Sequence, residues 1–268
     1  MVERYIKDSG VAIAKWVLLI IFTALFLLDL FLVAAGRTQA IDMAVQGAVL
    51  GLREEALTTI FGVITFFGNP LTMIALCVFI VILPSRMKIG LPVALMTAIG
   101  WFAHTLLKSV VARPRPDMEY WLVNESGYSF PSGHANASMI FWVALLILIG
   151  RVLVLQYNSF AAVLLRIVFF IFAALIGLSR IYLGVHYCSD VFGGWMLACI
   201  ILILSFALYE NLWPSKWRVT YFNPEWDAIP RNAEKKRAWR KPSKRRAQHE
   251  PVKFPKNRSP WKIPPPSS

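Results

Sequence analysis

The chain has 268 residues, of which 57% are hydrophobic and only 16% are charged, and its formal net charge is +13 at pH 7. An ordinary soluble domain is about half apolar and about a quarter charged. This composition therefore excludes a purely soluble, disordered or collagen-like protein, and three cysteines are too few for a disulfide scaffold. It predicts a polytopic membrane protein with a soluble appendix.

Six apolar segments are long enough to cross a bilayer, since a helical span needs about 20 mostly apolar residues. The first also resembles a signal peptide, but its apolar stretch is longer than the roughly 7–15 residues typical of one, so we expect an uncleaved helix. The second is charge-free throughout and fits one long span or a span with an interfacial turn. The predicted fold is all-α with six transmembrane helices, at residues 16–35, 56–85, 89–107, 136–155, 162–181 and 191–210.

The rest of the chain is a basic tail. Residues 213–268 carry fifteen Lys and Arg against four Asp and Glu, are rich in proline and lack apolar periodicity. We therefore expect two units, a membrane domain over residues 1–212 and a disordered tail over 213–268. Basic segments stay in the cytoplasm, so six spans place both termini there. The tail then faces an anionic lipid surface, which we expect it to contact, and no specific nucleic acid is expected.

Three short motifs stand at the outer ends of the last four predicted spans, where helix packing can gather them at one membrane surface. Their lysine and arginines offer donors suited to phosphate oxygens. Backbone amides that open a helix, at Ser132 and Gly133, can hold an anion. The motifs are Lys108 with Arg115-Pro116, Pro131-Ser132-Gly133-His134, and Ser179-Arg180 with His186 and Asp190.

The two histidines of these motifs suggest covalent chemistry. His186 and Asp190 are four residues apart, which on a helix would let the carboxylate orient the imidazole as an activated nucleophile. His134 could donate a proton to a departing oxygen. The outer segments contain no cluster of residues with metal-ligand spacing, so we expect the cations to take the place of a metal, and we expect no cofactor.

Together the motifs resemble the signature of the type 2 phosphatidic acid phosphatase superfamily, which reads Lys-x6-Arg-Pro, Pro-Ser-Gly-His and Ser-Arg-x5-His-x3-Asp. The resemblance covers the chain from about the second span to the sixth. It implies a metal-independent phosphatase of a bacterial plasma membrane, with an extracytoplasmic active site. The implied substrates are lipid phosphates or diphosphates, such as phosphatidic acid, phosphatidylglycerophosphate or undecaprenyl diphosphate.

The resemblance also implies a role for each matching residue. His186 would form a phosphohistidine, Asp190 would orient His186, and His134 would protonate the leaving group. The phosphate would be bound by Lys108, Arg115, Ser132, Gly133 and Arg180.

Two other classes of protein remain open. A lipid or anion transporter or flippase could hold an anion with the same cations but would not need the His186–Asp190 pair. A non-catalytic membrane scaffold would present the tail to partners. Among residues outside the motifs, we expect Arg113 to be a surface charge or accessory contact, His104 to serve packing, and Asp29 to have a helix-pairing or interfacial role.

Overall fold

The computed structural model describes residues 2–152 and 160–214, and the side chains at 13–150, 164–165 and 167–214. Within this part of the chain all regular structure is helical. The predicted tail lies outside the described residues, except for Trp213 and Pro214. The α-helices are α1 (Val2–Ala34), α2 (Gln39–Leu50), α3 (Glu55–Phe66), α4 (Pro70–Ile82), α5 (Leu91–Val111), α6 (Gly133–Val152), α7 (Phe160–Tyr182) and α8 (Cys188–Leu212), with short turns η1 (Arg86–Gly90) and η2 (Met118–Tyr120).

Four stretches of the described helices are long and apolar enough to cross a membrane, and the bent pair α3–α4 supplies a fifth if it is one span. Helix α7 is also apolar, but its continuous stretch with described side chains, Ile167–Tyr182, is shorter. The described residues are therefore all-helical with four or five candidate membrane spans, and the predicted count of six stays a prediction. The four long stretches are Ile13–Ala34, Arg86–Val111, Gly133–Gly150 and Cys188–Leu212.

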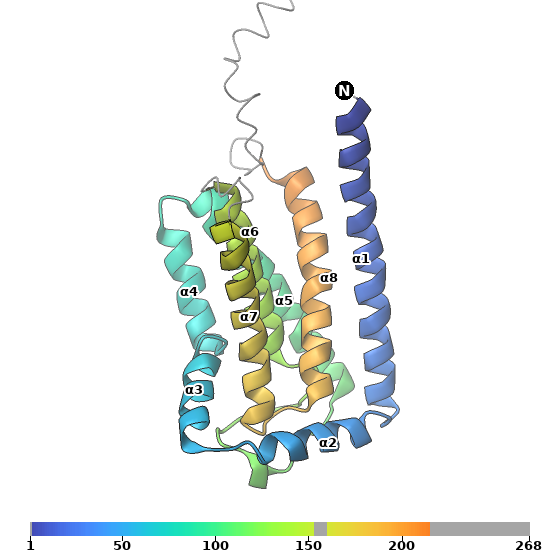
Figure 1. The fold of residues 1–268 in the computed structure, drawn as a ribbon, viewed down its shortest axis with the longest axis vertical. Coiled ribbons are helices and arrows are strands. Elements are labelled where there is room, and N and C mark those ends of the chain that lie inside the picture. Colours follow the sequence, from blue (N-terminus) through green and yellow to red (C-terminus); the bar gives the residue numbers. More distant parts are fainter. Residues whose placement is uncertain (1, 153–159, 215–268) are drawn as a thin grey trace, which may run out of the picture. The chain divides into compact units, whose positions relative to one another are not determined.

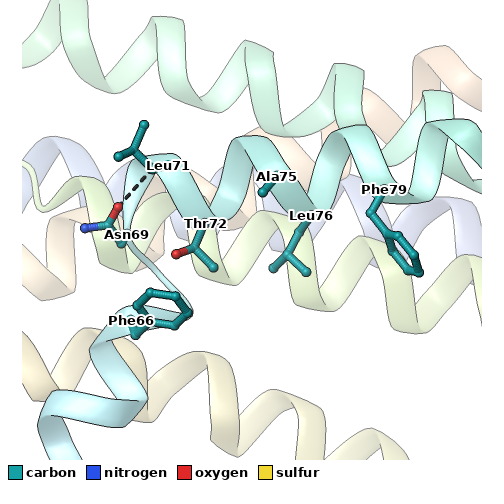
Figure 2. A pocket seen from close by; sticks show the side chains of 7 residues that line it. All are labelled: Phe66, Asn69, Leu71, Thr72, Ala75, Leu76 and Phe79. Carbon is teal, nitrogen blue, oxygen red and sulfur yellow. Dashed lines mark hydrogen bonds between the residues drawn. The ribbon is translucent and has the colours of Figure 1, made fainter.

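The second predicted span is broken between α3 and α4, which meet at 47°. Asn69 caps α4 by accepting a hydrogen bond from the backbone N–H of Leu71 at 2.9 Å, and Pro70 occupies the first helical position, where its missing N–H is not needed. Figure 2 shows this cap at one end of a groove of about 650 Å³ along α4, which includes Phe66 and Phe79 among its lining. The stretch that was predicted as one long span, or as a span with an interfacial turn, is thus two helices with a bend between them.

Helix α6 is the most buried of the long spans and packs against α5, α7 and α8. Its inward face carries small side chains, which let neighbouring helices approach closely. Helix α1 packs on the other side of α8 (Figure 1). The small buried residues of α6 are Ala135, Ala137, Ser138 and Ala144.

Helix α2, which the sequence analysis did not predict, crosses the end of the bundle where α7 ends and α8 begins (Figure 1). Its polar residues Asp42 and Gln46 are buried, whereas Ile41 and Met43 are exposed. This pattern is typical of a helix at the membrane interface, with apolar side chains toward lipid. The polar side of α2 is thereby directed to the end of the bundle that holds the motifs.

Candidate active site

All predicted site residues lie at the end of the bundle that α2 crosses. Lys108 is in the last turn of α5, His134 in the first turn of α6, and Arg180 in the last turn of α7. His186 and Asp190 lie where the chain enters α8. The structure therefore brings the three motifs together at one surface.

His186 and Asp190 are not on one helical turn, so that part of the prediction is wrong. Helix α7 ends at Tyr182, and Gly184 turns the chain with φ +77°, a conformation that favours glycine. His186 lies in the connection, while Asp190 is the third residue of α8. The Asp190 carboxylate caps α8 by accepting the backbone N–H of Tyr187 at 2.8 Å. The Asp190 side chain is thus held by the helix it begins.

Ser129 lies between the imidazole and the carboxylate, and nothing in the motif spacing indicated it. Its hydroxyl donates to Asp190 Oδ2 at 2.5 Å and lies 3.2 Å from His186 Nδ1. The direct distance from His186 Nδ1 to Asp190 Oδ2 is 3.5 Å, which is long for a hydrogen bond. Asp190 therefore orients His186 largely through Ser129.

The other nitrogen of His186 faces the cations. Arg115 Nη1 lies 3.1 Å from His186 Nε2, and since arginine can only donate, Nε2 carries the lone pair and Nδ1 the proton. Burial, and then the charges of Arg115, Lys108 and Arg180, lowers the pKa of His186 well below its ordinary value. The imidazole is therefore neutral in the empty site, with its basic nitrogen directed at the phosphate-binding groups.

Arg180 is almost fully buried, with 2% of its side chain exposed. One terminal nitrogen donates to Thr65 Oγ1 at 2.8 Å and the other contacts the Glu125 carboxylate. Its Nε is buried and has no hydrogen-bond partner. A buried donor without an acceptor is costly, so this N–H indicates the place of an oxygen from a ligand.

Glu125, in the loop before α6, also contacts Arg115, whose Nη2 lies 3.5 Å from Glu125 Oε2. Arg115 is further held by the backbone carbonyls of Val185 at 2.8 Å and Ser126 at 2.9 Å. Glu125 lies outside the three motifs, and nothing in their spacing indicated it. The Glu125 carboxylate contacts both arginines that were predicted to bind phosphate. It therefore occupies the position expected for an anionic ligand.

Lys108 and His134 complete the charged part of the site. Lys108 interacts electrostatically with Arg115, Arg180 and Glu125, and buried His134 interacts with Arg180 and His186. Among the described residues, no group of three or more His, Cys, Asp or Glu side chains is placed to hold a metal ion. Positive charge at the site comes from lysine and arginine side chains.

The turn at Ser132 and Gly133 only partly matches the expected anion cradle. The Ser132 N–H already donates to the carbonyl of Asp190 at 2.9 Å, which ties the start of α6 to α8. A Cβ on Gly133 would lie 2.8 Å from His104 Nε2, so a side chain does not fit there. His104 is buried, packs edge-on against Trp101, and fills the space beside Gly133.

Arg113 is not a surface charge, because only 13% of its side chain is exposed. It forms ion pairs with Asp190 and with Asp42 of α2, the latter also missed by the sequence analysis. Asp29 is buried on α1, with Oδ2 beside Gly193 of α8 and without a hydrogen-bond partner. It therefore lies at a contact between two helices.

The chain is similar to several known proteins. The model of the PAP2 superfamily matches residues 89–214. Phosphatidylglycerophosphatase B of Bacillus subtilis is 33% identical over 188 residues, which cover 68% of this chain and 91% of that protein. Undecaprenyl-diphosphatase of Sulfolobus acidocaldarius is 29% identical over 209 residues, 75% of this chain and 93% of that one. The crystal structure of a transmembrane PAP2 type phosphatidylglycerolphosphate phosphatase from Bacillus subtilis superposes with a TM-score of 0.58 at 30% identity, covering 71% of this chain and 96% of that one.

Proposed function

Since the chain belongs to the PAP2 superfamily and is a metal-independent membrane lipid phosphatase, we propose that it hydrolyses its substrates through a phosphohistidine at His186. The motif resemblance is confirmed at the level of family and activity. The observation that carries the proposed mechanism is the orientation of His186, whose Nδ1 faces Ser129 and Asp190 and whose Nε2 faces Arg115.

In the first step His186 Nε2 attacks phosphorus, and the bond to the leaving oxygen breaks. The bound phosphate offsets the cations that disfavour a protonated His134, and the protonated imidazole donates its proton to that oxygen, so that the lipid departs as an alcohol or as a monophosphate. The imidazole becomes positively charged, and Asp190 stabilises this charge through Ser129. Lys108, Arg115 and Arg180 bind the non-bridging oxygens, where negative charge is present in the transition state.

In the second step water attacks the phosphorus of the phosphohistidine. His134, now neutral, accepts a proton from this water, and phosphate leaves while His186 regains its lone pair at Nε2. The unpartnered Nε of Arg180 supports a phosphate oxygen in this position. Glu125 must leave the two arginines before a phosphate can bind.

The substrate class follows from the relatives and from the apolar surroundings of the site. The relatives named above act on phosphatidylglycerophosphate and undecaprenyl diphosphate, so we assign this chain a lipid phosphate or diphosphate monoester. A groove of about 560 Å³ is lined by residues of α4 and α5, among them Thr105, which lies one turn before Lys108. Its lining is largely apolar and suits the hydrocarbon chain of such a substrate.

The finer topology belongs to the same proposal. Helix α7, the fifth of the predicted spans, also crosses the membrane and brings the total to six, and residues 1–212 form the phosphatase domain. The basic tail over residues 213–268 contacts anionic lipids in the cytoplasm, and the site opens on the extracytoplasmic side of a bacterial plasma membrane. The fifteen Lys and Arg of the tail support this orientation.

Phosphate release from a panel of purified lipids tests the proposal. The panel contains phosphatidic acid, phosphatidylglycerophosphate and undecaprenyl diphosphate, and the assay includes excess chelator. We expect the wild type to release phosphate from at least one of them and His186→Gln to release none. His249→Gln, in the tail, is the matched control and should be fully active. Activity in His186→Gln would contradict the assignment of the nucleophile.

A further inference from the structure

Arg113 joins two buried carboxylates that lie on different helices. Its Nη1 donates to Asp190 Oδ1 at 2.6 Å and to Ser189 Oγ at 2.8 Å. Its Nη2 donates to Asp42 Oδ2 at 2.6 Å. The guanidinium also stacks on the Tyr187 ring, with Cζ 4.3 Å from the ring centroid. One cation thus connects α2 to the carboxylate that orients His186.

The Asp42 carboxylate is buried and held in place for its ion pair with Arg113. Only 1% of its side chain is exposed, and it accepts hydrogen bonds from the backbone N–H and the hydroxyl of Ser189, at 3.0 and 2.9 Å. Burial alone would raise the pKa of Asp42, but the bonds from Arg113 and Ser189 hold it below its ordinary value. Asp42 therefore stays ionised, and Arg113, whose own pKa these carboxylates raise, stays charged.

Each oxygen of Asp190 then has its own partner. Oδ1 is held by Arg113, while Oδ2 accepts from Ser129 and from the Tyr187 amide. A buried carboxylate without a cation would take up a proton and lose much of its ability to stabilise an imidazolium. Without Arg113, the charge of Asp42 would favour protonation of Asp190 further, because two buried negative charges would then face each other.

We propose that Arg113 and Asp42 are positioning residues for the phosphatase reaction, with Arg113 keeping Asp190 ionised and turned toward Ser129 and His186, and Asp42 holding Arg113 in place. This rests on the proposed function, in which Asp190 supports the nucleophile. It makes helix α2 part of the catalytic apparatus and assigns a role to the first arginine of Arg113-Pro114-Arg115-Pro116, outside the motif spacing.

The first test is Arg113→Met, which keeps much of the side-chain length and removes the charge. We expect kcat to fall about 10- to 100-fold, the range typical when a group that orients a reacting residue is lost, while KM changes less than about threefold. Arg113→Lys should be intermediate, since a compact ammonium cannot bridge both carboxylates. Arg37→Met, an exposed arginine before α2, is the control for charge on this face and should match the wild type.

The second test separates positioning from simple attachment of α2. In the Arg113→Met background, Asp42→Asn removes one of two facing negative charges, so kcat should rise severalfold, by about five, although one more contact is lost. Asp42→Asn alone should lower kcat modestly, by about threefold. If Arg113 merely fastens α2 to α8, the double variant will instead be less stable and no more active than Arg113→Met.

All rates are referred to folded enzyme, measured by thermal unfolding in detergent. A kcat within about threefold of wild type in Arg113→Met, or no gain in the double variant, overturns the inference. If Arg113→Met does not fold, the inference is tested with Arg113→Lys and Asp42→Asn instead. An unchanged kcat in both of these variants overturns the inference. Asp190→Asn is run in parallel, because full activity there would refute the proposed function itself and not the part played by Arg113.

Discussion

Replacing Gly133 with alanine is a demanding test of the turn that begins α6. The added Cβ would lie 2.8 Å from His104 Nε2, where ordinary contacts begin at 3.4 Å, so one group must move by about 0.6 Å. His104 is buried on α5 and cannot swing into solvent. Overpacking of this kind typically costs about 1–3 kcal/mol, and a displacement of this size near reacting groups can lower kcat/KM by about 10- to 100-fold.

The assay is phosphate release in detergent for Gly133→Ala, His104→Ala and the double variant. Removing the imidazole makes room for the new methyl group, so the double variant should recover at least about tenfold in kcat/KM over Gly133→Ala, a coupling that only neighbouring groups show. Full activity in Gly133→Ala, or strictly additive losses in the double variant, would refute the close packing of His104 on this turn.

Three further predictions concern the charged groups. Glu125→Gln should lower the inhibition constant of vanadate or phosphate severalfold, by about five, because the anion no longer competes with a carboxylate for Arg115 and Arg180; an unchanged constant in a titration would show that Glu125 does not occupy the anion site. Ser129→Ala should reduce kcat by about tenfold with little change in KM, measured by steady-state kinetics, and an unaffected kcat would mean that Asp190 acts on His186 directly. Since burial and nearby cations lower the pKa of His186, its neutral form persists as pH falls below 6.5; kcat/KM, corrected for ionisation of the substrate phosphate, should therefore not fall as the pH is lowered through 6.5, and an acid-side loss of activity centred there would contradict the lowered pKa.

Apolar length was sufficient to predict four of the six spans, and the residue types and spacing of the three motifs were sufficient to predict the family. Sequence spacing gave a wrong prediction for His186 and Asp190, because the backbone between α7 and α8 is not helical. Asp190 is four positions after His186, but Gly184 has turned the chain and α8 starts only at Cys188. An aspartate is common in the first turn of a helix, where its carboxylate can accept a hydrogen bond from the backbone N–H before the helix. The residue type of Asp190 could therefore have indicated that a helix begins near it.

The remaining contacts depend on packing between distant segments. Asp42 and Arg113 are 71 residues apart, and the isolated residues give no sign that they will meet. The break at Asn69-Pro70 could have been predicted, since asparagine followed by proline is a common helix start. Helix α2 could also have been suspected, because polar residues at Asp42 and Gln46 fall four apart on one helical face.

The central claim is that His186 carries the phosphoryl group, and trapping the intermediate tests it most directly. Enzyme mixed with a phosphorus-labelled lipid substrate is quenched in alkali, where phosphohistidine is stable, and the modified peptide is sequenced by mass spectrometry. Because Nδ1 is held toward Ser129 and Asp190, the account predicts label on His186 at Nε2, accumulating in His134→Ala with an activated aryl phosphate. Label on another residue, on Nδ1, or on no residue during active turnover would contradict it.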